Sequence, residues 1–191
     1  MEITIFKDIK DTAQPFYRDV SKILERIQEG ASKDIVRSIR EEKDKEIRNK
    51  LKQSLPAVCF SGKFSKRNDS SLLEHSGLIC LDFDNFPTEK LLLEQKEFLT
   101  KDKYTYSVFI SPSGLGLKAL VKIPAEGDTH KQFFNSLQLH YDSEYFDIAC
   151  KNVSRVCYES YDPLIFINEQ SSVFNQIIEQ EYQEVVKHKD V

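Results

Sequence analysis

Two aspartates, Asp82 and Asp84, lie at the end of a short apolar segment, residues 77–85, with the sequence GLICLDFDN. An apolar run of this length is typical of a buried strand, and because side chains alternate along a strand, both carboxylates should project from the same face. Two like charges so close together repel each other unless a cation lies between them or one carboxylate is protonated. Hard divalent cations such as Mg²⁺ and Mn²⁺ prefer oxygen ligands, and the spacing therefore predicts a cation site.

The aspartate pair leaves a second interpretation open, in which the carboxylates cap a helix near Pro87 or lie solvated in a loop. A third carboxylate, Asp147, lies at the edge of another apolar run, residues 145–148. If these acids gather at one place, neutralising Asp82 or Asp147 should relieve repulsion. We therefore expect such variants to stay folded, or to become more stable, in the absence of metal.

Two loops carry residues that are suited to phosphate. Residues 111–118, SPSGLGLK, join two apolar segments; the glycines let backbone N–H groups approach a phosphate, and Lys118 supplies a positive charge. The spacing is not that of a P-loop, and a plain hairpin would need the same glycines. Residues 61–67, SGKFSKR, place Lys63 and Arg67 around an aromatic residue, either as a solvated turn or as a phosphate contact.

Composition restricts the classes of protein to be considered. The net charge is −4 over 191 residues, so any contact with nucleic acid must come from a local basic patch. The four cysteines form no CxxC pair, which favours reduced thiols in an intracellular protein. The sequence shows no apolar leader and no stretch as long as a membrane span. We expect a soluble, cytoplasmic protein without a membrane partner.

The periodicity of apolar residues places the remaining elements. Helices are predicted over residues 16–30, 32–55, 91–99 and 129–140 and from Ser171 onward, and strands over residues 2–6, 57–60, 104–110, 119–123, 156–158 and 164–167. The charges within residues 32–55, which include Lys45 and Arg48, are interpreted as a solvated helix face.

These elements predict an α+β fold in which helices flank a mixed or antiparallel sheet that follows an N-terminal pair of helices. One face of the sheet should carry Asp82, Asp84, Ser113 and Asp147, and the helices of the first 55 residues should cover the opposite face or pack at its side. Residues 1–168 are expected to form one domain, and residues 169–191 a C-terminal helix or linker.

The order of these motifs resembles the primase-polymerase domain of the archaeo-eukaryotic primase superfamily, in which hydrophobic-Asp-x-Asp, a small-x-His motif after a strand, and hydrophobic-Asp follow one another. More closely, the chain resembles the VirE N-terminal family, whose domains occur at the head of primase-helicase proteins of bacterial mobile elements and phages. The blocks that carry this resemblance are residues 55–56 with 60–64, 77–84, 111–118, and 151–157 with 160–163. It covers roughly residues 1–168, and the last block is its most specific part.

The resemblance implies a nucleotidyltransferase, a DNA primase or polymerase with a primase-polymerase-like sheet. Two Mg²⁺ or Mn²⁺ ions would activate the 3′-hydroxyl and stabilise the leaving pyrophosphate, and Lys118 stands where the superfamily has its histidine. The implied partners are a single-stranded DNA template, nucleoside triphosphates, and a helicase domain or subunit that this chain lacks. The implied residues are Asp82, Asp84 and Asp147 as catalytic metal ligands, Ser111, Ser113, Gly114, Gly116 and Lys118 for the triphosphate, and Lys63, Arg67, Lys151 and Arg155 for phosphate or template.

Two other functions remain open on the sequence. The first is a module that has kept the fold and binds nucleotide or DNA within a primase-helicase with weak or no catalysis; Lys118 and the acidic net charge favour it. The second is a phosphatase of the haloacid dehalogenase type, whose first motif is also Asp-x-Asp after a strand. That family expects Thr or Ser two residues after the second aspartate, whereas Phe86 occupies this position.

Overall fold

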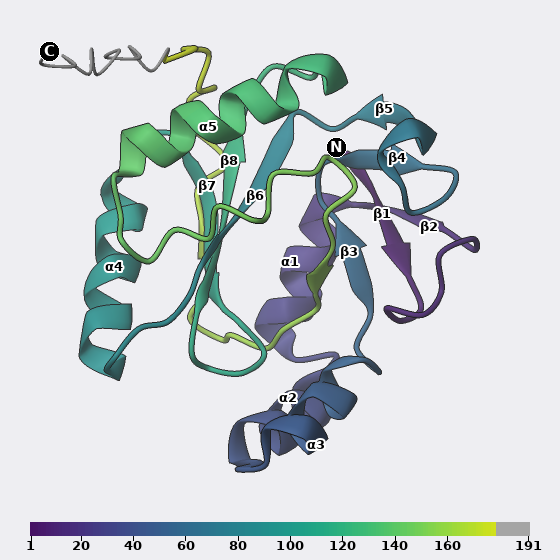
Figure 1. Ribbon diagram of the computed structural model, residues 1–191, viewed down its shortest axis with the longest axis vertical. Coiled ribbons are helices and arrows are strands. Elements are labelled where there is room, and N and C mark those ends of the chain that lie inside the picture. The colour runs from purple at the N-terminus through teal and green to yellow at the C-terminus, as the bar shows by residue number, and fades with distance from the viewer. Residues whose placement is uncertain (179–191) are drawn as a thin grey trace, which may run out of the picture.

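The computed structural model describes residues 1–178 and arranges their strands in two four-stranded sheets and one two-stranded sheet, in which all pairings are antiparallel (Figure 1). The predicted α+β class is therefore confirmed. The first sheet has the order β2 (Phe16–Asp19), β1 (Glu2–Phe6), β3 (Ala57–Cys59) and β9 (Cys157–Tyr158); the second has the order β10 (Phe166–Ile167), β7 (Thr105–Ile110), β8 (Leu117–Lys122) and β6 (Leu78–Phe83); the third pairs β4 (Gly62–Phe64) with β5 (Leu72–His75).

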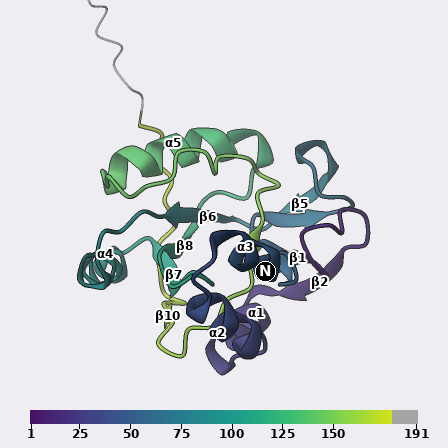
Figure 2. The same ribbon diagram turned by 60° about the horizontal axis from the view of Figure 1, so that its bottom comes forward.

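The second sheet is buried on both faces. Leu81 and Phe83 of β6 pack with α4 (Glu89–Lys101) and α5 (His130–Tyr141), whereas Leu78 of β6 and Leu120 of β8 pack with α1 (Val20–Glu29) and the first sheet. Figure 2 shows α5 on one side of this sheet and α1 on the other. Because Asp82 shares the face of Leu78, α1 lies on the same side as Asp82. Of the two placements predicted for the N-terminal helices, on the opposite face or at the side of the sheet, the opposite face is wrong for α1, since α4 and α5 cover that face.

The N-terminal helices differ from the predicted pair. Residues 16–19 form β2, and α1 begins only at Val20 because the Asp19 carboxylate accepts the Ser21 backbone N–H at 2.9 Å as an N-cap. The predicted helix over residues 32–55 is divided into α2 (Lys33–Glu41) and α3 (Lys45–Lys52). Asp44 starts α3 by accepting the backbone N–H groups of Glu46 and Ile47 at 2.8 and 2.9 Å. Three helices therefore take the place of two.

The predicted C-terminal helix is wrong over its described part, because residues 171–178 form no helix. Phe174 is buried against the rings of Tyr104 and His140, and its backbone N–H donates to the carbonyl of Lys122 at 2.7 Å. These contacts hold an extended segment against the second sheet in place of a free helix. The remainder of the predicted helix, from residue 179, lies outside the described residues.

Two expectations from composition can be compared with the structure. All four cysteines are free thiols. Over residues 1–178, the helices are too short and too polar for any of them to cross a membrane.

A buried pair of histidines joins the two-stranded sheet to α5. The Nε2 of His75 lies 3.0 Å from the Nδ1 of His130, and the His75 Nδ1 accepts the Gly77 backbone N–H at 3.0 Å. This acceptor role places the proton of His75 on Nε2, which donates to His130. Burial lowers the pKa of His75 to about 4 and that of His130 to about 3; the charge of His75 lowers the latter further, and Asp69 opposes this effect.

Acid should destabilise the protein through these histidines. An unfolded histidine takes up a proton near pH 6.5, so the unfolded chain binds more protons than the native protein below that pH and native stability falls. Between pH 7.5 and 5 each histidine should cost on the order of 2 kcal/mol. The change His130→Asn keeps an acceptor near Nδ1 and should make the stability less dependent on pH. Urea unfolding of both proteins at the two pH values measures this; equal losses would contradict a titrating pair.

Candidate functional site

The Asp82 carboxylate forms a buried ion pair with Lys118. The two residues are direct partners across β6 and β8, and the Lys118 ammonium contacts the Asp82 Oδ2. Only 12% and 9% of the two side chains are exposed. Burial alone would lower the pKa of Lys118, but the charge of Asp82, the nearby Cys157 and Cys80, and the hydrogen bond to Asp82 together outweigh this effect and raise it. Lys118 therefore remains a cation that neutralises Asp82.

A loop after α5 brings Asp147 beside the end of β6. The Asp147 backbone N–H donates to the Asp82 carbonyl at 2.9 Å, and the Asp84 N–H donates to the Tyr145 carbonyl at 2.8 Å. Between these bonds Phe83 and Phe146 form a β-bridge, with their rings edge to face at a centroid distance of 5.3 Å. This pairing brings together two acids that are far apart in the sequence.

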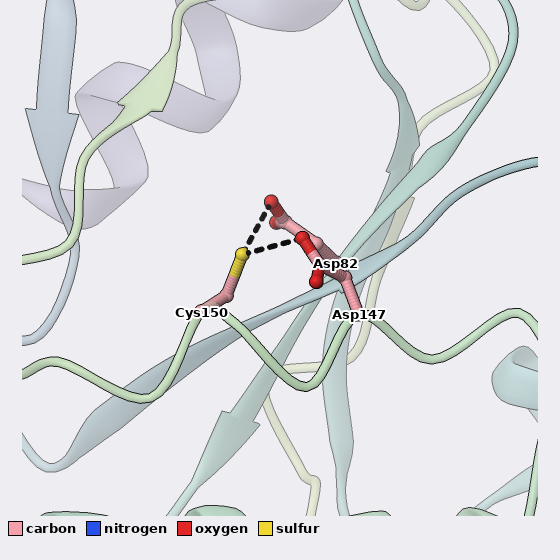
Figure 3. A group of neighbouring side chains, drawn as sticks. All are labelled: Asp82, Asp147 and Cys150. Atoms are coloured by element: carbon pink, nitrogen blue, oxygen red, sulfur yellow. Dashed lines mark hydrogen bonds between the residues drawn. The ribbon is translucent and has the colours of Figure 1, made fainter.

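Cys150 completes the acid cluster, by which we mean Asp82, Asp147 and Cys150 (Figure 3). Its Sγ lies 3.0 Å from the Asp147 Oδ2 and 3.2 Å from the Asp82 Oδ2, so the thiol can donate to either carboxylate. One ligand atom from each residue lies within 4.8 Å of the others. Burial and the nearby charge of Asp82 raise the pKa of Cys150, which keeps it a neutral thiol. From the sequence, Cys150 was predicted only as one of four reduced thiols, although its position three residues after Asp147 could have indicated that the two side chains lie close together.

Asp84 lies outside the acid cluster. Asp84 directly follows Phe83, the last residue of β6, and its carboxylate is not one of the ligand groups that converge with Asp82 and Asp147. Its carboxylate instead packs over Gly116, where an added Cβ would lie 2.1 Å from the Asp84 Oδ1 and 2.8 Å from the Phe83 carbonyl. Burial raises the pKa of Asp84, and the charges of Asp82 and Asp147 add to this effect although Lys118 opposes it.

The Asp147 carboxylate is held in its ionised form by its neighbours. Burial alone would raise the pKa of Asp147, but hydrogen bonds from the Cys150 thiol and the Ala149 backbone, together with the charge of Arg155, lower it. The repulsion that the sequence predicted therefore acts mainly on Asp84.

In the glycine-rich hairpin between β7 and β8, some residues shape the turn or pack inside the protein, and others line a cavity. Gly114 has a φ of +75° and donates its backbone N–H to the Ser111 carbonyl at 2.9 Å, which closes the turn. Ser111 is buried, and its hydroxyl lies 3.2 Å from that of Ser113. Among the residues expected to bind the triphosphate, Ser113, Gly116 and Lys118 take different places: Ser113 lines a cavity, Gly116 makes room for Asp84, and Lys118 pairs with Asp82.

The four basic residues expected to contact phosphate or template differ in their surroundings, although the charges of Arg67 and Arg155 both act on Tyr158. Lys63 of β4 forms ion pairs of 3.1 Å with both Glu2 and Glu74. The charge of Arg67 acts on Cys59 and Tyr158, and Lys151 is exposed. Arg155 lies close enough to the acid cluster to interact with it. Burial alone would lower the pKa of Arg155, but the charges of Cys150, Asp82 and Asp147 raise it.

Two carboxylates have structural roles in and beside the block that seemed most specific, residues 151–157 with 160–163: Asp162 lies within it, and Glu159 lies between its two parts. Glu159 is buried and accepts hydrogen bonds from Arg26 at 2.6 and 3.0 Å and from the Ser32 hydroxyl. Asp162 is buried as well and accepts the Ile110 backbone N–H at 2.9 Å and the Lys96 ammonium at 2.7 Å. These carboxylates attach the last segment to the helices and to β7.

A cavity of about 560 Å³ opens beside the acid cluster. Asp84, Asp147, Glu144 and Ser113 line one side, and Phe86 and Tyr145 contribute stacked rings with a centroid distance of 4.3 Å. The other side comes from α3, through the side chains of Lys45, Arg48, Asn49 and Lys52. This role of α3 was not predicted from the sequence, because helix periodicity alone does not show which residues lie near a charged helix face.

Fold and site together define an α+β domain in which two carboxylates and a thiol converge beside a polar cavity. The chain belongs to the BT4734-like N-terminal domain family, whose model matches residues 50–166, a range that contains the acid cluster and Asp84. This family is distinct from the VirE N-terminal family that the motifs resemble. No match was found among curated proteins or among solved structures.

Neutralising Asp82 and neutralising Asp84 should change the free energy of unfolding in opposite directions. Asp82→Asn leaves the buried Lys118 ammonium without its partner, which should destabilise the protein by about 3 kcal/mol. Asp84→Asn removes a charge that partial burial disfavours, and should stabilise the protein. Urea unfolding at pH 7 with a chelator measures both variants. If both substitutions stabilised the protein, repulsion would govern Asp82 as well.

Proposed function

We propose that this domain is a metal-dependent nucleotidyltransferase, a primase or polymerase domain that extends or initiates strands on a DNA template from nucleoside triphosphates. The convergence of Asp82 and Asp147 beside a cavity that Asp84 also lines carries this proposal. A volume of about 560 Å³ is within the range of small-molecule sites. The order of the three acids along the chain, which resembles the primase-polymerase motifs, adds support, and we extend the proposal to a replication protein of a mobile element or phage that works with a helicase.

The described side chains fit one divalent cation between Asp82 and Asp147. Lys118 and Cys150 both contact the Oδ2 of Asp82, while its Oδ1 accepts no hydrogen bond from the described residues. Carboxylate oxygens are the ligands that Mg²⁺ and Mn²⁺ favour. A second ion, as in a two-ion site, would require Asp84 together with oxygens of the substrate. When bound, such cations neutralise charge on the attacking and leaving oxygens of a phosphoryl transfer.

The chain's own residues take distinct roles in this proposal. Lys118 fixes the Asp82 carboxylate, and Asp147 is fixed by its backbone bond to Asp82 and by the Cys150 thiol. Arg155 presents a guanidinium next to these acids, which suits phosphate oxygens of the template or the leaving group.

A non-catalytic nucleotide- or DNA-binding module is the second candidate, and one observation favours it. The Lys118 ammonium already neutralises Asp82, so an internal cation takes part of the place that a metal would fill. The phosphatase alternative fits less well, because it requires a free nucleophilic carboxylate at Asp82, whereas this carboxylate is nearly buried and bound to Lys118.

Titration of Mn²⁺ with a nucleoside triphosphate, followed by strand synthesis on single-stranded DNA, tests the proposal. In Asp147→Asn the cluster loses one ligand charge, and we expect synthesis and metal-dependent binding to fall by about 100-fold or more. Asp142→Asn, the same change at an exposed position after α5, should behave as the wild type. Metal-dependent binding without synthesis by the wild type would favour the non-catalytic module. Absence of metal-dependent binding would contradict nucleotidyl transfer, and absence of any binding of the triphosphate or of single-stranded DNA would contradict both candidates.

A further inference from the structure

The cavity has a positively charged side that the acid cluster does not explain. We propose that Lys45, Arg48, Asn49 and Lys52, which we call the α3 wall, bind the phosphate chain of a nucleoside triphosphate. The identity of the ligand as the substrate rests on the proposed function, whereas the position of the wall rests on the geometry of the cavity. The sequence had placed this role on the hairpin of residues 111–118.

Helical geometry explains why these four side chains act together. They are spaced i, i+3, i+4 and i+7, which places them on one face of α3. On another side of the helix, Leu51 packs with Val36 and Ile39 of α2 and thereby sets which face turns toward the cavity. Lys50 does not line the cavity, and its position on the helix lies roughly 150° from the centre of the wall.

The positive charges of the wall are not neutralised by the protein. Within residues 1–178, Lys45, Arg48 and Lys52 form no ion pair. Partial burial lowers the pKa of Lys52, and the charges of Arg48 and Lys118 lower it further, against the opposing effect of Asp84. A bound polyanion would relieve this repulsion and gain charge-assisted hydrogen bonds.

The acidic residues of the cavity favour a small ligand over a nucleic acid strand. Asp84, Glu144 and Asp147 line the same cavity as the α3 wall, and their negative charge repels a second run of phosphates. A single triphosphate can place its phosphates against α3 and its base against the rings of Phe86 and Tyr145. Charge and volume therefore favour a mononucleotide.

Fluorescence anisotropy of a labelled nucleoside triphosphate with the full chain in EDTA tests the α3 wall apart from any metal. Lys52→Gln should raise the Kd by about 10-fold, and Arg48→Gln by a similar factor, since each removes a charged hydrogen-bond donor. Lys50→Gln is the matched control, with the same substitution on the same helix, and should change the Kd by about 2-fold or less. Inorganic tripolyphosphate should displace the label. Thermal unfolding should show Lys52→Gln to be folded, since it removes a charge that burial disfavours.

Equal effects of Lys52→Gln and Lys50→Gln would overturn the assignment. Displacement by a single-stranded oligonucleotide but not by tripolyphosphate would overturn it as well, since the wall would then contact a strand. Strand synthesis separates this inference from the proposed function. If binding depends on Lys52 but the wild type carries out no synthesis, the result would support triphosphate binding by the α3 wall and contradict nucleotidyl transfer. If the protein carries out synthesis and Lys52→Gln leaves the KM for the triphosphate unchanged, the result would support the proposed activity and contradict triphosphate binding by the α3 wall.

Discussion

The buried ion pair between Asp82 and Lys118 is the interaction on which the rest of the site depends. A charge buried between two sheets costs free energy unless an opposite charge and hydrogen bonds accompany it. Lys118 supplies the charge, and the Cys150 thiol supplies a hydrogen bond. The pair forms only in the observed register of β6 and β8, because a slip of one residue would turn Asp82 toward the apolar core beneath α4 and α5. The packing of the sheet thus fixes the chemistry at its edge.

Because of this ion pair, the three aspartates differ in the charges that surround them. The ion pair also links the binding of a cation to the binding of the substrate. A divalent cation must share Asp82 with Lys118, so two carboxylates alone offer it little net negative charge. Asp84 stands apart at the cavity, where burial raises its pKa. A triphosphate bound on the α3 wall would bring both negative charge and oxygen ligands. The cation should therefore bind the protein–triphosphate complex more tightly than it binds the free protein. The triphosphate should likewise bind the protein–cation complex more tightly, since such coupling is reciprocal.

The sequence predicts most of what local patterns determine. The strand that carries Asp82 follows from an apolar run, and the hairpin before Lys118 follows from its glycines. The sequence does not predict those features of the site that depend on contacts between distant segments. The bridge between Phe83 and Phe146, which brings Asp147 and Cys150 to Asp82, leaves no periodic signal. The break between α2 and α3 arises from one capping side chain, that of Asp44. Asp44 lies in a run of charged residues whose pattern is equally compatible with a continuous helix.

The two sides of the cavity belong to parts of the chain with different physical constraints. The acid cluster is built into the sheet core, whereas α3 has no fully buried residue and is held through α2 by a small separate group of apolar side chains. Arg40 of α2 connects the two parts, since it donates to the carbonyls of Ser111 and Tyr161 at 3.3 and 2.8 Å. Displacing α3 disrupts far less packing than displacing β6. The width of the cavity can therefore adjust to a ligand on the side of the α3 wall while Asp82 and Asp147 keep their positions.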